Sequence, residues 1–196
     1  MVEMAIAITL LLVLTLGFVD FGHAFYQWNA ATKAVQMGAR LASISDPAVT
    51  AAALAAADPA TNPGAPITAG TYSFECKYSG GTGACNGNSA IFNPNAFSRI
   101  FRGDTTYSDS DACPALAANQ RPGMCQFFPG LQRNNVVVTY TATGLGYQTR
   151  LGGPVPTITV SLQSINFQFF FLGFADITVP SMLSTVTGED LKSTSP

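Results

Sequence analysis

The fold is decided by the N-terminal stretch of residues 1–45, which reads MVEMAIAITLLLVLTLGFVDFGHAFYQWNAATKAVQMGARLASIS. It contains no proline, and residues 4–19 carry no ionisable side chain. At 1.5 Å per residue, a helix over residues 4–19 is roughly 24 Å long, and one that continues to Trp28 is roughly 37 Å long. These lengths bracket a bilayer core of about 30 Å. The sequence therefore predicts one long helix that inserts into a membrane and continues into water.

Residues 46–196, here called the head, have the size of one compact domain. Charged residues make up only 10% of the chain, while Ala, Gly, Ser, Thr, Asn and Pro are abundant. Such a composition suits a secreted or surface-exposed protein that packs against copies of itself. The net charge of −2 and the scattered Lys and Arg give no basic patch, so nucleic acid is not an expected partner.

The four cysteines all lie in the head, at spacings that match no zinc knuckle or ribbon. Two disulfides formed in an oxidising compartment are the favoured interpretation, and four buried free thiols are the alternative. Three pairings are open, of which the sequence-local pairs Cys76–Cys85 and Cys113–Cys125 are preferred because each closes a short loop. Disulfides place the head outside the cell, with the N-terminus facing the cytoplasm during insertion.

Glu3 stands at the start of the apolar run, where a carboxylate interacts favourably with the positive end of the helix dipole. If the helix enters a bundle of identical helices, Glu3 is buried and needs a partner. The N-terminal amine of a neighbouring copy is the candidate. No basic region precedes the run, so the expectation is that the chain begins inside a longer precursor or that translation does not start at the printed Met1.

Two further features lie on the same helix. Asp20, His23 and Gln27 are spaced to share one face, and their expected role is a local polar contact at the membrane boundary. Asp20 and His23 are also candidates for contacts between copies during assembly. His23 is the only histidine and has neither a nucleophile nor companion ligands, so neither catalysis nor metal binding is expected of it. Small residues at four-residue spacing predict close packing of a helix or sheet, and they are Ala30, Ala34, Gly38 and Ala42.

Beyond the long helix, turn signals and periodicity divide the head. Asp46 as N-cap and Pro47 at the first helical position predict a short helix over residues 47–57. A Pro/Gly-rich loop follows at 59–71, and alternation from Tyr72 predicts a strand. Residues 80–88 are expected to form a glycine-rich loop tip closed by Cys76 and Cys85. Residues 90–130 are expected to be a long irregular insertion pinned by Cys113 and Cys125.

The last third of the chain has the clearest strand pattern. Residues 135–144 and 156–168 are β-branched and alternating, and a hairpin-like connection joins them. A third strand is expected at about 177–186. The aromatic cluster between the last two strands is interpreted as core, membrane contact or subunit interface, and it contains Phe167, Phe169, Phe170, Phe171 and Phe174. Of these, Phe169, Phe170, Phe171 and Phe174 are the interface candidates.

Two motifs in the insertion are weak. Arg102-Gly103-Asp104 spells an integrin-binding tripeptide, but three residues recur by chance, so a chance occurrence is preferred. Asp104, Asp109 and Asp111 lack the spacing and closing Glu of a calcium loop, so a solvated acidic loop is preferred. No cofactor or metal is expected.

The N-terminal stretch resembles the TadE/TadG-like family, the pilin-related proteins of tight-adherence pili. In that family a Glu opens the apolar run, Gly-x-x-[Asp/Glu]-x-Gly follows, and an Ala-rich helix ends in Gly-Ala-Arg-x-Ala. The corresponding residues here are Glu3, the stretch Gly17-Phe18-Val19-Asp20-Phe21-Gly22, and the stretch Gly38-Ala39-Arg40-Leu41-Ala42. The resemblance covers about a quarter of the chain and implies a type IV pilin-like α+β fold, with a long helix followed by an antiparallel sheet.

The resemblance also implies processing by a prepilin peptidase, extraction from the inner membrane and packing of long helices into an extracellular pilus. The expected function is a structural pilin that polymerises with itself through residues 1–45, with the help of pilus assembly machinery. The alternative is a low-copy minor pilin that acts as an adhesin or assembly initiator. An enzyme ranks last, because a Ser-His-Asp or Cys-His site needs a histidine in the head.

Overall fold

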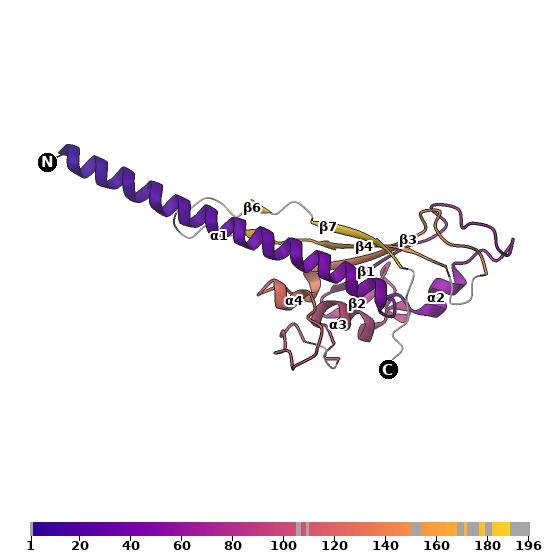
Figure 1. Cartoon of the computed structure of the whole chain (residues 1–196). Helices are drawn as coiled ribbons and strands as arrows, with labels where there is room; N and C mark the ends of the chain where they lie inside the picture. Colours follow the sequence, from indigo (N-terminus) through magenta and orange to yellow (C-terminus); the bar gives the residue numbers. More distant parts are fainter. Residues whose placement is uncertain are drawn as a thin grey trace.

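The computed structural model describes residues 2–104, 107–108, 110–149, 154–167, 171, 177–178 and 182–188. One helix, α1 (Val2–Ile44), runs from the N-terminus past the whole sheet (Figure 1). The predicted long helix is therefore confirmed. Its first half projects beyond the head, and its second half lies across the sheet. Helix α1 and the sheet that follows it form an α+β, pilin-like fold, as expected from the sequence.

The sheet has five antiparallel strands in the order β2-β1-β3-β4-β7. The central strands β3 (Val136–Thr141) and β4 (Thr157–Leu162) pair directly, as the hairpin-like connection predicted. Alternating residues of both strands, such as Val138, Tyr140 and Val160, point to the core and are fully buried. The opposite face is rich in Thr and Ser, and Thr159 and Thr185 contact each other there through their hydroxyls at 3.2 Å.

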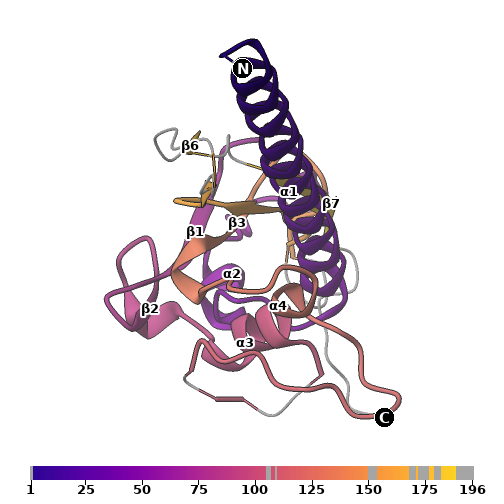
Figure 2. The same cartoon turned by 90° about the vertical axis from the view of Figure 1, so that its left-hand side faces the viewer.

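The core lies between the inner face of this sheet and the second half of α1. Helix α1 contacts β4, β7 (Leu183–Thr187), α3 (Pro94–Arg102) and α4 (Met124–Phe127). Figure 2 shows the two short helices on the same side of the sheet as α1. Tyr140 is fully buried, and its hydroxyl accepts a hydrogen bond from the Ala48 N–H at 2.8 Å. Burial raises the pKa of Tyr140, so this phenol stays protonated at neutral pH.

The first cysteine pair lies inside the sheet rather than at the base of a loop. Strands β1 (Ser73–Ser79) and β2 (Thr82–Cys85) form a two-residue hairpin around Gly80 and Gly81, both at positive φ. Only these glycines form the tip, so the expected loop over 80–88 is wrong in extent. Cys76 and Cys85 face each other in the strand register and form a buried disulfide.

The short helix after α1 begins later than predicted. Helix α2 spans Ala51–Ala56 with Thr50 as N-cap, so the assignment of Asp46 as N-cap and Pro47 as first helical residue is wrong. The intervening residues pair with a distant segment. Thr50 donates its N–H to the Ile91 carbonyl at 2.8 Å, and the Ala48 carbonyl accepts from Asn93 N–H at 2.7 Å. These long-range hydrogen bonds satisfy the backbone in place of a helical turn.

The insertion over 90–130 is more regular than expected. It contains helices α3 and α4, and a 3₁₀ turn, Ser89–Ile91, overlaps its start. Asn93 caps α3 by accepting a hydrogen bond from the Ala96 N–H, and Pro94 occupies the first turn. Phe97, Ile100 and Phe101 fill the core from this helix. Another 3₁₀ turn, Arg133–Asn135, leads into β3.

The third strand of the last region is split in the structure. Strand β7 forms the sheet edge, while β5 (Asn166–Phe167) and β6 (Ile177–Thr178) form a separate two-stranded ladder. Of the predicted strand over 177–186, residues 177–178 and 183–186 are in strands, Met182 is not, and residues 179–181 lie outside the described residues. Phe169, Phe170 and Phe174 lie outside the described residues, so their predicted interface role stays a prediction.

Candidate functional site: an assembly surface on the N-terminal helix

The first half of α1 is an uncovered apolar surface. From residue 2 to residue 19, every residue except Leu16 and Gly17 is exposed. Phe18 is 70% exposed and Val2 is 73% exposed. By length and composition α1 qualifies as a membrane-crossing helix, and only 6% of its most apolar window is buried. Soluble proteins rarely expose contiguous apolar surface of this kind, so this helix indicates membrane anchoring or contact with other chains.

Glu3 is exposed in the first turn of this helix. Within residues 2–19 it is the only ionisable side chain. Its position is compatible with the expected interaction with the helix dipole, and its predicted role in contacts between copies stays a prediction.

The small residues of α1 face the head of the same chain. Ala30, Ala34, Gly38 and Ala42 are all buried. A Cβ atom at Gly38 would lie 2.5 Å from Met124 Sδ and 3.2 Å from Val160 Cγ1, so α4 and β4 approach the helix closely here. The close packing predicted from the spacing occurs within the chain. Because these residues are covered by the head, their role in contacts between copies stays a prediction.

Asp20 joins α1 to the segment that follows β5. It is only 2% exposed, and its Oδ2 accepts a hydrogen bond from the Phe171 N–H at 2.9 Å. Phe171 itself is 56% exposed. The structure thus brings together Asp20 and one of the four interface candidates, a contact between residues 151 positions apart.

A cavity of about 370 Å³ lies one turn further along, between α1 and the head. His23 and Gln27 line it, and His23 Nε2 lies 3.4 Å from Gln27 Nε2, so the predicted shared face is confirmed for this pair. The facing wall belongs to the head and includes Phe128, Asn135 and Ser164. Asn135 Nδ2 donates to the carbonyls of Gln163 and Ser164, which holds the two wall segments together.

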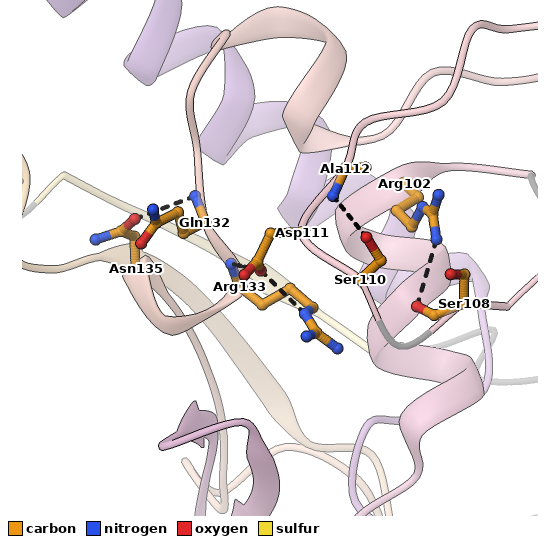
Figure 3. A network of polar contacts seen from close by, with 8 residues as sticks. All are labelled: Arg102, Ser108, Ser110, Asp111, Ala112, Gln132, Arg133 and Asn135. Atoms are coloured by element: carbon orange, nitrogen blue, oxygen red, sulfur yellow. Dashed lines mark hydrogen bonds and ion pairs between the residues drawn. The ribbon is translucent and has the colours of Figure 1, made fainter.

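Two ion pairs hold the loop between α3 and α4: Asp111 joins it to Arg133 beyond α4, and Asp104 pairs with Arg121 within the loop itself. The Asp111 carboxylate accepts hydrogen bonds from the N–H and the Nε–H of Arg133, at 2.9 and 3.0 Å (Figure 3). The Asp104 carboxylate accepts from the N–H and the Nε–H of Arg121, at 3.2 and 2.8 Å. Partial burial works to raise the pKa of each carboxyl, but these hydrogen bonds and the arginine charge outweigh it and lower the pKa.

These ion pairs also decide between the interpretations of two sequence motifs, the tripeptide at residues 102–104 and the acidic residues Asp104, Asp109 and Asp111. Asp104 and Asp111 are bound to different arginines, and Asp109 lies outside the described residues. Arg102 and Gly103 are buried, so the tripeptide Arg102-Gly103-Asp104 is not presented at the surface. The second disulfide, Cys113–Cys125, closes this loop, and both disulfide pairs are those that the sequence favoured.

Tyr72 is a buried group outside this loop. Its burial, together with the nearby Asp58 charge, raises the pKa of Tyr72 to about 12.

A long helix with an uncovered apolar half and an antiparallel sheet packed on its other half defines the pilin-like class of α+β proteins. The comparison with protein families agrees, since residues 1–40 match the model of the family described as TadE-like protein. The resemblance of the N-terminal stretch is thereby confirmed. This family is associated with tight-adherence pili and is structural rather than catalytic. No curated protein and no solved structure matched the chain.

The cavity wall and the Phe171 contact are the features that sequence reasoning missed. Phe128, Asn135 and Ser164 come from three separate parts of the chain, and only the fold brings them to α1. No local pattern marks them. The polar face at His23 and Gln27 was the available signal for one side of this cavity.

Proposed function

We propose that the chain is a structural pilin-like subunit, which polymerises with copies of itself through α1 into an extracellular filament. The observation that supports this most is the uncovered apolar surface over residues 2–19. Each large apolar side chain that becomes buried contributes about 1.5–3 kcal/mol. A bilayer covers this surface before assembly, and neighbouring α1 helices would cover it in the filament.

The two halves of α1 support different steps of this proposal. The second half is packed within its own head, so the subunit arrives with its head already folded around residues such as Ala34 and Gly38. Residues 2–15, which make up most of the first half, are exposed and are therefore available to partners. Glu3 would be buried on assembly and would need a hydrogen-bonding or charged partner in a neighbouring copy.

The proposed route runs from the inner membrane to the cell surface. The two disulfides support an oxidising environment for the head, and the apolar helix supports a membrane-anchored stage. The proposed partners are further copies of the chain, the inner membrane, the pilus assembly machinery and a prepilin peptidase. These partners follow from the TadE-like match of residues 1–40.

The test is electron microscopy of filaments sheared from the surface of cells that express the full chain. Antibodies against the head should decorate the whole filament length, and this chain should be the dominant protein of the preparation. Recovery of the protein only as membrane-bound monomers, from cells with the assembly machinery intact, would contradict polymerisation.

A low-copy minor pilin is the second candidate. It is favoured by the loop between α3 and α4, which carries the Cys113–Cys125 disulfide and the Asp104 and Asp111 ion pairs. A loop braced at these points suits recognition of a receptor or another pilin. Stoichiometry separates the two candidates, because a minor pilin would decorate only the filament tip or a few sites along it.

A further inference from the structure

The position of the cavity along α1 fixes its depth relative to the bilayer in which the subunit is anchored. About 20 helical residues cross a hydrocarbon core of about 30 Å. A core that begins at the first turn of α1 therefore ends near residue 22, and His23, Tyr26 and Gln27 fall in the headgroup layer. Phe25 and Tyr26 are 69% and 64% exposed at this level, as expected of residues in an interfacial aromatic belt.

The lining of the cavity combines polar and apolar groups. His23 and Gln27 offer ring nitrogen and amide groups on one wall, and Asn135 and Ser164 contribute to the other. Phe128 and Ile165 add apolar surface. Neither Lys nor Arg is among the residues that the structure places around the cavity. Such a lining fits a group that has both signs of charge better than one with a large net negative charge.

We propose that this cavity binds the headgroup of a zwitterionic glycerophospholipid while the subunit is in the membrane. The phosphate would accept hydrogen bonds from His23 and Gln27, and the ammonium would lie near carbonyl oxygens and the Tyr26 ring. The acyl chains would then run along the exposed apolar residues of α1 that precede His23. The inference rests on the membrane placement in the proposed function and does not depend on polymerisation.

The first test is native mass spectrometry of the full-length protein, purified in detergent and titrated with dioleoyl phosphatidylethanolamine. The wild type should retain one tightly bound lipid. The double variant His23→Leu, Gln27→Leu should bind this lipid at least about tenfold more weakly, because both polar partners of the phosphate are lost. Asn29→Leu is the matched control, since Asn29 is exposed at the same level of α1 but does not line the cavity.

Two results would overturn the assignment. One is equal lipid binding by the double variant and the wild type, and the other is an equal loss in the Asn29→Leu control. Circular dichroism verifies that each variant is folded. Filament formation is scored separately in cells: loss of filaments with retained lipid binding contradicts only polymerisation, and retained filaments without lipid binding contradict only the lipid site.

The second test identifies the occupant in cell membranes. Tyr26 is replaced by the photoreactive residue p-benzoylphenylalanine, and the mass of the adduct is measured after irradiation. A phospholipid adduct supports the proposal if it disappears when His23 and Gln27 are both changed to Leu. An adduct with the N-terminal peptide of a second copy, in place of lipid, would overturn it and would assign the cavity to the neighbour's Glu3 region.

Discussion

At the scale of single residues, Gly38 sets how closely α1 approaches the head. The position lacks room for a methyl group, because a Cβ would lie 2.5 Å from Met124 Sδ, and Met124 is itself fully buried. Gly22 provides a contrast on the same helix, since a Cβ there would meet no atom within 4 Å. The two glycines therefore have the same helix propensity and different packing.

The first prediction compares Gly38→Ala with Gly22→Ala. Alanine gains up to about 1 kcal/mol over glycine in a helix, whereas overpacking of a core costs about 1–3 kcal/mol. Gly38→Ala should therefore destabilise the fold by roughly 1 kcal/mol, and Gly22→Ala should be neutral or stabilising. Chemical unfolding of the full chain in detergent, followed by near-ultraviolet circular dichroism, measures both. Equal midpoints for the two variants would mean that Gly38 is not a close-packing site.

The second prediction concerns Glu3, whose carboxylate is exposed at the end of the apolar surface. Glu3→Ala should leave membrane insertion intact, because the apolar run is unchanged. Filament yield should fall by about tenfold or more if the carboxylate pairs with a neighbouring copy, since a buried charge pair contributes strongly only when both members are present. Membrane fractionation and counts of surface filaments measure the two effects. Normal filament formation by the variant would contradict the role given to Glu3.

At the scale of elements, the sequence predicts those structures whose signals are local. Length, the absence of proline and the apolar run predict α1 to within one residue at its C-terminal end. The alternation of β-branched residues predicts β3 and β4, but the single strand expected over 156–168 is wrong, because β4 ends at Leu162 and residues 163–165 separate it from β5. The start of α2 could not be predicted, because its preceding residues pair with Ile91 and Asn93, which are far away in the sequence. Helix α3 has a local start signal, Asn93 as N-cap and Pro94 in the first turn, which the expectation of an irregular insertion over 90–130 leaves unused.

The third prediction concerns the loop between α3 and α4. Its carboxyls Asp104 and Asp111 have lowered pKa values in the folded protein, so their stabilising contribution is present above the unfolded pKa of about 3.9 and is lost as pH falls through the folded pKa. Asp111→Asn should increase hydrogen exchange in this loop at pH 7. The difference from wild type should begin to shrink as the pH falls below about 3.9 and should vanish once the pH is below the lowered pKa values of the folded carboxyls, where the wild-type groups are protonated too.

Hydrogen exchange with mass spectrometry measures this effect after correction for the intrinsic rate at each pH. Glu75→Gln is the matched control, because Glu75 forms an exposed pair with Lys77 in a strand and contributes little to stability. An unchanged exchange rate in Asp111→Asn at pH 7 would show that the Asp111–Arg133 pair does not hold the loop.

At the scale of the whole molecule, the division of α1 into a covered and an uncovered half links fold to function. The sequence shows that residues 1–45 form one apolar helix, and the resemblance of that helix predicts the pilin-like class. It does not show which face the head covers, because the covering residues come from β4, β7 and α4. The cavity at His23 and the contact from Asp20 to Phe171 depend on the same tertiary packing.

The central claim is that residues 2–19 of α1 form the interior of a filament. The most direct measurement is a cryo-electron microscopy reconstruction of filaments sheared from cells that express the full chain. We expect the first half of α1 at the filament axis, in contact with the same segment of neighbouring copies, and the Thr-rich face of the sheet outside. A filament in which residues 2–19 face solvent, or in which this chain is absent from the shaft, would contradict the account.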